Sequence, residues 1–346
     1  MANWRERLYG DSLPWLLETD PEQPAIRYLA LRDILGRSQD DGEVSEAKNA
    51  IMNTGPVPEI LAAQTPEGYW LTPGAHVGVK YRGTAWQVIF LAQLGADGSE
   101  PGIQAGCEHV LAHNIASNGG FAVGFSYKAI PSGFIHCMGG NLGAALIDLG
   151  WLDDKRLQSA LDWQARMITG DEVASSESKH TDRRYYKSGT TGPAFACAMN
   201  GNLPCAWGAI KAILAFGKVP VAKRTKRMAA AIEQGVDFLL SHDPAVADYP
   251  FGFGNKPNSG WFKFGYPIGY ITDVLQNLEV LVALGKAQDT RLARSLELVA
   301  AKQDDRGRWR LEYSYNGKSW VDIETKGQPS KWVTLRALRV LKAAYP

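Results

Sequence analysis

Three of the four cysteines lie near the expected beginnings of apolar helical segments. Cys137, Cys197 and Cys205 have this placement, whereas Cys107 lies in the middle of another expected helix. The positive end of a helix dipole stabilises a thiolate, so a thiol at a helix N-terminus suits nucleophilic chemistry or metal binding. A thiol inside a helix is more often a small apolar packing group, which is how we interpret Cys107.

A zinc ion is the cofactor that these thiols would bind. Cys137, Cys197 and Cys205 could supply three ligands, with His136 or His180 as the fourth. Four protein ligands would make such a zinc ion structural, and an open position would make it catalytic. The spacing is not that of a zinc finger. The metal ligands predicted on this hypothesis are Cys137, Cys197, Cys205 and His180.

Acid–base chemistry without a metal is the second interpretation of these residues. A histidine beside a pair of thiols can move protons on an alkenol or a similar apolar substrate. Asp273 begins another apolar segment, where it can cap the helix; in an apolar cavity it would be held protonated and act as a general acid. The predicted catalytic residues are His136, Cys137, Cys197, Cys205 and Asp273. In a third interpretation, the thiols only pack between helices.

Aromatic and basic residues gather in the same segments, just before apolar helices. Polar and aromatic groups that converge on one concave surface are typical of a small-molecule site. Tyr266 and Tyr270 are spaced by one helical turn and could share a face with Asp273. The predicted substrate-binding residues are Tyr81, Arg82, Tyr127, Tyr185, Tyr186, Trp261, Tyr266, Tyr270 and Trp332.

The helices that must position these residues form a repeat. Apolar residues recur at helical spacing in six segments, most of which end in an apolar pair and a glycine that suits the left-handed end of a helix. These segments are 25–36, 84–95, 139–150, 207–217, 273–285 and 332–345. From the second unit on, a second helix is expected before each one. These helices are 57–64, 104–114, 154–168, 223–241 and 290–303.

Six helical hairpins of about 60 residues each predict an all-α fold. One hairpin cannot bury its apolar face alone, so neighbouring hairpins must stack and share a core. We expect a single (α/α)6 toroid over residues 1–346, a closed ring whose inner helices line a central cavity; an open solenoid is the alternative. The irregular stretch 170–204 is long enough to be a lid over one end of the cavity.

Two segments share the pattern Q-x-x-x-G-x-W, at residues 64–70 and 303–309. They resemble the QW motifs of squalene and oxidosqualene cyclases. The run from Asn118 to Phe121, followed by the segment from Cys137, resembles the repeat of protein prenyltransferase β subunits. The resemblance implies an (α/α)6 toroid of the terpenoid cyclase-like superfamily. Within the motif, the glutamine would bond the backbone at the next helix start, and the tryptophan would cover the helix junction.

The catalytic motifs of these families are absent from the sequence. It contains neither the D-x-D-D of alkene-protonating cyclases, nor the D-D-x-x-D that binds magnesium diphosphate, nor the Asp-x-Cys zinc pair of the prenyltransferases. The resemblance therefore favours the fold more strongly than any one reaction.

Composition narrows the class of function. The formal net charge is +1, which argues against a nucleic-acid partner because such proteins need a basic face. No apolar stretch is long enough to span a bilayer, and no signal peptide is recognisable, so a cytoplasmic location is expected. The leading hypothesis is an enzyme that isomerises, cyclises or eliminates from an apolar, isoprenoid-like molecule. The alternatives are a zinc enzyme that uses the three thiols and a noncatalytic toroid that binds a lipid or a protein partner.

Overall fold

The computed structural model describes residues 3–74, 79–122, 128–175, 178–179, 186–187, 189–254 and 256–346. Over these residues the chain is mostly helical, which confirms the expected helical class. The strands are pairs of two residues each: β1 (Val173–Ala174) pairs with β2 (Tyr186–Lys187), β3 (Ala196–Cys197) with β4 (Leu203–Pro204), and β5 (Trp309–Arg310) with β6 (Pro329–Ser330). No described helix is both long and apolar enough to cross a membrane.

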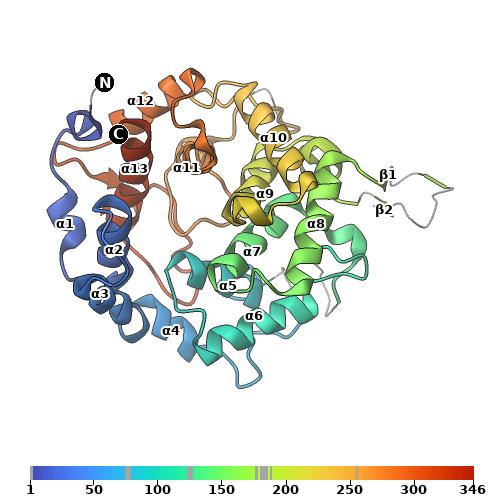
Figure 1. The fold of residues 1–346 in the computed structure, drawn as a ribbon, viewed down its shortest axis with the longest axis horizontal. Helices are drawn as coiled ribbons and strands as arrows, with labels where there is room; N and C mark the ends of the chain where they lie inside the picture. The colour runs from blue at the N-terminus through green and yellow to red at the C-terminus, as the bar shows by residue number, and fades with distance from the viewer. Residues whose placement is uncertain are drawn as a thin grey trace.

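The six predicted leucine-rich segments all form helices, and these lie toward the centre of the molecule (Figure 1). They are α2 (Pro24–Leu29) continued by η2 (Ala30–Ile34), α5 (Thr84–Gln93), α7 (His136–Asp148), α9 (Ala206–Lys218), α11 (Val274–Leu281) continued by η8 (Val282–Lys286), and α13 (Lys331–Ala344). We call this set the inner helices. Their apolar residues are mostly buried, because the inner helices pack on one another and on outer helices, as α7 packs on α5, α8 and α9.

A second set of helices lies outside the first (Figure 1). It comprises α1 (Leu13–Leu17), α3 (Gly42–Asn53), α4 (Pro56–Ala62), α6 (Pro101–His113), α8 (Lys155–Thr169), α10 (Lys226–Leu240) and α12 (Ala293–Ala301). The sequence interpretation missed α3. It begins after an N-cap at Asp41 and buries Val44, Ala47 and Ile51, but lacks the apolar–glycine ending that identified most of the inner helices.

Short 3-10 turns connect many of these helices. They are η1 (Trp4–Arg7), η3 (Pro131–Gly133), η4 (Pro193–Phe195), η5 (Ala198–Asn200), η6 (Val221–Lys223), η7 (Ser259–Phe262) and η9 (Thr290–Leu292).

The glycines that end the inner helices adopt the expected conformation, with one exception. Gly36, Gly95, Gly150 and Gly285 have positive φ angles of 69°, 72°, 89° and 79°. Gly217 instead lies within α9, where a Cβ atom would come 3.2 Å from Leu284 Cδ2. At Gly217, glycine therefore permits close packing of α9 against η8.

The two Q-x-x-x-G-x-W segments make equivalent contacts. Trp70 is fully buried and donates its indole N–H to the carbonyl of Ile60 at 2.7 Å, and the Gln64 amide donates to the carbonyl of Gly102 in the first turn of α6 at 2.8 Å. The expected structural role of this motif is confirmed.

In the second copy, Trp309 is also fully buried and donates to the carbonyl of Val299 at 2.7 Å. The Gln303 amide donates to the carbonyl of Arg7 at 2.9 Å and accepts from the backbone of Tyr9 at 2.7 Å. The last copy thus connects α12 to the beginning of the chain. The Trp4 backbone N–H also donates to the carbonyl of Tyr345 at 2.9 Å, so the first and last elements lie side by side (Figure 1).

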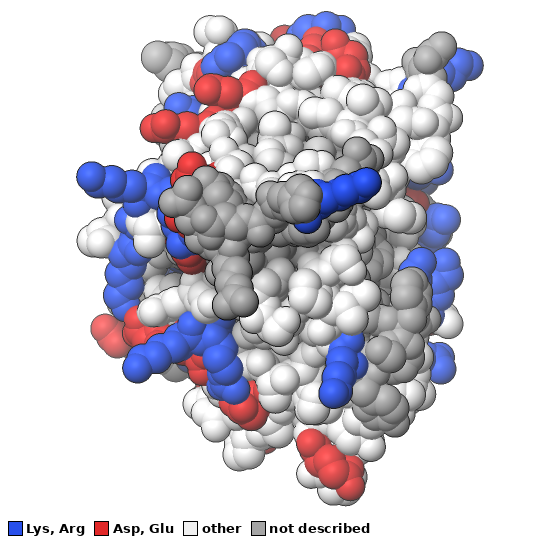
Figure 2. Space-filling view, turned by 90° about the vertical axis from the view of Figure 1, so that its right-hand side faces the viewer, with Lys and Arg blue, Asp and Glu red and all other residues white. Residues whose placement is uncertain are grey.

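The segment 170–204, predicted to be a lid, is described only in part. Its second half packs on the N-terminal end of α7, where Thr191 donates to the carbonyl of Phe134 at 3.1 Å. The face that carries α8 and β1 shows basic and acidic side chains scattered among uncharged ones (Figure 2). Lys and Arg residues therefore do not gather into one basic patch on this visible face.

Candidate functional site

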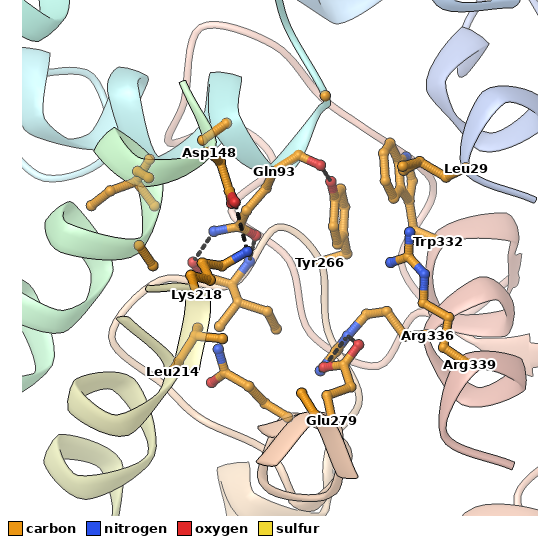
Figure 3. Close-up of a pocket in the computed structure, with 18 of the residues that line it drawn as sticks. Leu29, Gln93, Asp148, Leu214, Lys218, Tyr266, Glu279, Trp332, Arg336 and Arg339 are labelled. Atoms are coloured by element: carbon orange, nitrogen blue, oxygen red, sulfur yellow. Dashed lines mark hydrogen bonds and ion pairs between the residues drawn. The ribbon is translucent and has the colours of Figure 1, made fainter. Parts of the chain in front are cut away.

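A cavity of about 710 Å³ lies between the inner helices (Figure 3). Every inner helix contributes to it, with residues that lie mostly toward the helix C-terminal ends. The apolar wall includes Leu29, Ile89, Ala144, Ala145, Leu214, Val280 and Val340. A volume of this size is typical of sites that enclose a small or mid-sized organic molecule.

The floor of the cavity is a loop that precedes α11 and folds into the centre of the molecule. Gln93 holds this loop: its side-chain amide donates to the carbonyl of Ile268 at 2.8 Å and accepts from the Ile268 backbone at 2.7 Å. Tyr266 donates its phenol to the Gln93 carbonyl at 2.6 Å and stacks on Trp332, with ring centroids 3.9 Å apart. Asn141 donates to the carbonyl of Gly269 at 3.1 Å, which fixes the loop to α7.

An ion-pair network crosses one side of the cavity. Arg336 of α13 bonds Asp273 through two nitrogens, at 3.0 and 3.1 Å, and bonds Glu279 of α11 at 2.8 Å. Arg336 and Asp273 are almost fully buried, whereas Glu279 lines the cavity with 23% of its side chain exposed. The two carboxylates raise the pKa of Arg336, although burial alone would lower it. The network fixes the orientation of the Glu279 carboxylate.

Further charged groups lie at the C-terminal rim of the cavity. Lys218 of α9 bonds Asp148 of α7 at 2.7 Å, and Arg339 of α13 pairs with Asp33 of η2. Arg32 also lines the cavity and donates to the phenol of Tyr28 at 2.9 Å. Cations at helix C-termini interact favourably with the negative ends of the helix dipoles.

Asp273 caps α11, accepting from the backbone of Gln276 at 2.7 Å, as the capping interpretation predicts. Its two oxygens are occupied by Arg336, Gln276 and Gly265. In this structure both carboxylate oxygens of Asp273 are therefore already hydrogen-bonded, and the side chain caps α11 and holds Arg336.

The predicted thiols lie at the opposite end of the inner helices from the cavity. Cys137 is in the first turn of α7, and Cys205 is the N-cap of α9. Cys197 lies in β3, and interaction with the Cys205 side chain is the main cause that lowers the pKa of Cys197 to about 7. Burial raises the pKa of Cys137 to about 11. The structure thus brings the three thiols into one neighbourhood.

These thiols do not form the predicted zinc site within the described part of the chain. No group of three or more His, Cys, Asp or Glu side chains there has the geometry to hold a metal ion. His180 lies outside the described residues. His136 is buried, and its Nε2 atom lies 2.9 Å from the carbonyl oxygen of Gly192. Burial lowers the pKa of His136 to about 4, so it is a neutral core histidine at neutral pH.

The predicted substrate-binding residues divide into four groups. Tyr266 and Trp332 line the cavity. Tyr81 and Tyr270 instead pack on Trp86 on the other side of the loop, with ring centroids 5.0 and 4.7 Å from it. Two more lie away from the cavity: Arg82 lies over the Trp320 ring, and Trp261 is buried and donates to the carbonyl of Pro244 at 2.8 Å. Tyr127, Tyr185 and the side chain of Tyr186 lie outside the described part of the structure.

Sequence reasoning missed Glu279, Arg336 and a buried lysine. Lys211 of α9 is fully buried; its ammonium donates to the hydroxyl of Thr272 and lies 3.4 Å from the Gln276 amide oxygen. Burial lowers the pKa of Lys211 to about 8. One sequence signal for Lys211 was available, because it is the single charged residue in the apolar segment 207–217. Burying a charge is costly unless it has a role or a partner, so such a residue marks a possible site.

Comparison with known proteins gives distant likenesses only. No family model matches the chain, and no curated protein matches it. A solved structure of a protein from Actinoplanes is 14% identical, with a TM-score of 0.45, over 93% of this chain and 90% of that one.

The type II terpene cyclase MstE from Scytonema is 14% identical, with a TM-score of 0.33, over 87% of this chain and 98% of that one. A variant of MstE in complex with geranylgeranyl dihydroxybenzoate is 15% identical, with the same TM-score, over 87% and 97%.

Proposed function

We propose that this protein is an enzyme that encloses a small or mid-sized, mainly apolar molecule of isoprenoid type in the central cavity and transforms it by acid–base chemistry. The reaction class is isomerisation, elimination or cyclisation. The observation that carries the proposal is the cavity of about 710 Å³, which combines an apolar wall with a carboxylate held in a fixed orientation. Apolar walls bind the body of such a molecule, and a few placed polar groups act on it.

The proposal includes a closed (α/α)6 toroid. Its support is the contact of the first and last elements, through Gln303 with Arg7 and Tyr9, and through Trp4 with Tyr345. The two glutamines of the Q-x-x-x-G-x-W segments support the same topology, because each connects its outer helix to the next element around the ring. A closed ring gives the cavity walls on all sides.

Glu279 is the residue that we assign to proton transfer. It lines the cavity, and the guanidinium of Arg336 contacts both of its carboxylate oxygens, at 3.0 and 3.1 Å from Nε. A positioned carboxylate can remove a proton from carbon next to a cationic or polarised centre. Asp273 has an indirect role, because it holds the Arg336 side chain that contacts Glu279.

Binding is tested by filling the cavity. Prenyl alcohols such as geraniol and farnesol are titrated while tryptophan fluorescence is recorded, since Trp332 lines the cavity. Leu214→Trp places a large side chain in the cavity and should weaken binding at least tenfold. Val221→Trp is the matched control, because Val221 is 76% exposed on the surface. Equal affinities for wild type and Leu214→Trp would overturn the assignment of the cavity.

Turnover separates the enzyme from a noncatalytic binding protein. Products of the bound alcohols are followed by gas chromatography with mass detection. Glu279→Gln keeps the shape of the side chain and should lower turnover at least a hundredfold with little change in affinity. Affinity without turnover in the wild type would favour the noncatalytic toroid for these ligands.

A further inference from the structure

The side-chain amides that line the cavity differ in the partners of their nitrogens. Gln93 donates to the carbonyl of Ile268. Asn141 donates to the carbonyl of Gly269, so both of these amides hold the loop that precedes α11. The amide nitrogen of Gln276 donates to no group in the described part of the chain, and it is not sealed off by protein atoms. This nitrogen is therefore a donor with access to the cavity, which Gln276 lines.

Lys211 determines which end of the Gln276 amide faces the cavity. Its ammonium group lies 3.4 Å from the amide oxygen of Gln276 and also donates to the hydroxyl of Thr272. An ammonium group can only donate, so the oxygen of the amide must face it, and the amide N–H groups are left to face the cavity. A cation at the amide oxygen also polarises the amide and makes its N–H groups stronger donors.

The complete burial of Lys211 gives this contact its weight. Burying a charge is costly unless the charge has a partner or a role. Although burial lowers the pKa of Lys211 to about 8, the side chain remains mainly protonated at neutral pH. Its hydrogen-bond partners among the described residues are the Thr272 hydroxyl and the Gln276 amide oxygen, and no carboxylate bonds it. The buried charge is thus linked directly to the orientation of Gln276.

Gln276 lies close to the residue that we assign to proton transfer. Gln276 and Glu279 are one turn apart on α11, and both line the cavity. Residues three positions apart on a helix have Cβ atoms about 5–6 Å apart. A ligand oxygen that accepts from Gln276 therefore places the carbon atoms beside it within reach of Glu279.

We propose that the Gln276 amide donates a hydrogen bond to an oxygen atom of the bound molecule, and that Lys211 is a positioning residue that keeps these N–H groups turned toward the cavity. The ligand is then an isoprenoid with a hydroxyl or carbonyl oxygen rather than a pure hydrocarbon. Gln276 selects the ligand by this oxygen, and Glu279 acts on a neighbouring carbon. The inference rests on the proposed function, because it concerns the same cavity and the same kind of ligand.

Two ligands that differ only in one oxygen test the role of Gln276. Geranylacetone, whose carbonyl can only accept, and the hydrocarbon with a methylene group in place of that carbonyl are titrated while tryptophan fluorescence is recorded. The ratio of their affinities is compared between variants, because the cost of removing each ligand from water is the same for all of them and cancels. In Gln276→Met the ratio should shift about fivefold against the ketone, since one hydrogen bond is lost and the length of the side chain is kept.

The matched control for this substitution is Gln104→Met. Gln104 is exposed on α6, so the same chemical change there should leave the ratio as in wild type. Circular dichroism melts establish that each variant is folded. A ratio that is the same in wild type and Gln276→Met would overturn the inference.

Lys211→Met tests the positioning role. The released Gln276 amide can turn its oxygen toward the ketone, so the ratio should shift in the same direction, by about twofold to threefold. Adding Lys211→Met to Gln276→Met should cause no further shift, because Lys211 acts through Gln276. Shifts that add in the double variant, or an equal loss of affinity for both ligands in Lys211→Met, would contradict this role.

Leu214→Trp separates the inference from the proposed function. If it weakens the binding of both ligands while Gln276→Met leaves their ratio unchanged, the cavity assignment stands and the inference about Gln276 is wrong. If Leu214→Trp changes neither affinity, the proposed function fails, and the inference fails with it.

Discussion

Arg336 and Asp273 form a double hydrogen-bonded ion pair between the last two inner helices. Two guanidinium nitrogens each meet one carboxylate oxygen, at 3.1 and 3.0 Å, and only 4% and 2% of the two side chains are exposed. Buried charges are costly unless their hydrogen bonds are all made, so each partner depends on the other.

Asp273→Asn tests this dependence. Asparagine is also a good helix cap, so the substitution removes the charge and keeps the cap of α11. We expect a loss of about 3–5 kcal/mol in the free energy of unfolding, because Arg336 keeps its buried charge and loses its main partner. Urea unfolding measures the loss. Glu279→Gln is the control and should lower the free energy of unfolding by less, since Glu279 is partly exposed. A larger loss for Glu279→Gln than for Asp273→Asn would contradict the assignment of Asp273 as the main partner of Arg336.

The lowered pKa of Lys211 predicts that the free energy of unfolding rises as the pH becomes alkaline. Its pKa in the folded protein is about 8, below the ordinary value of 10.5, so the folded state binds fewer protons between these pH values. The free energy of unfolding should rise as the pH rises from 8 to 10.5, by about 3 kcal/mol for a difference of 2.5 pKa units.

The matched measurement for this gain is the difference between wild type and Lys211→Met in urea unfolding at several pH values. The difference in the free energy of unfolding should change between pH 8 and 10.5 and stay constant below pH 8. A difference that is flat from pH 7 to 10.5 would show that Lys211 is not buried as a charged group.

The raised pKa of Glu324 predicts the opposite change of stability with pH, in the range between pH 4.5 and 7. Burial raises its pKa to about 7 from an ordinary 4.5, and hydrogen bonds from Ser330 and from the Lys331 backbone offset only part of this rise. The folded state therefore binds more protons between pH 4.5 and 7, and this contribution to stability falls as the pH rises through that window.

Glu324→Gln should remove this loss of stability with rising pH, which is about 3 kcal/mol for a pKa difference of 2.5. Thermal melts of the two proteins from pH 4 to 8 provide the comparison. The melting temperature of the variant should rise relative to that of the wild type as the pH rises. Parallel plots of melting temperature against pH would contradict the raised pKa of Glu324.

Gln303 predicts a local effect at the beginning of the chain. Gln303→Ala removes the bonds to Arg7 and Tyr9 and should cost about 1–3 kcal/mol. Hydrogen exchange should also speed up in residues 3–10. Gln64→Ala is the matched control, because it removes the equivalent bond to Gly102 without touching the terminus. Exchange at residues 3–10 that is the same in both variants would argue against the connection through Gln303.

The helices were largely predictable because their signals are local. Apolar spacing, caps and closing glycines identified all six inner helices, and the spacing of Gln64 and Trp70 indicated contacts that the structure contains. The missed helix α3 has a good N-cap at Asp41, and Gly55 follows its C-cap with a positive φ angle of 71°, but no apolar pair precedes this glycine. The search therefore depended strongly on the apolar–glycine ending.

The site was not predictable to the same extent, because its contacts join distant parts of the chain. The cysteines at helix starts were correctly placed near the N-terminal ends of inner helices, but the cavity lies toward the other ends. Gln93 and Ile268 are 175 residues apart, and their pairing places a loop in the centre of the molecule. Local periodicity therefore determined which segments are helices and which of their faces are apolar. Only the tertiary structure decided which charges meet and where an open volume remains, because both depend on side chains brought together after the helices have packed.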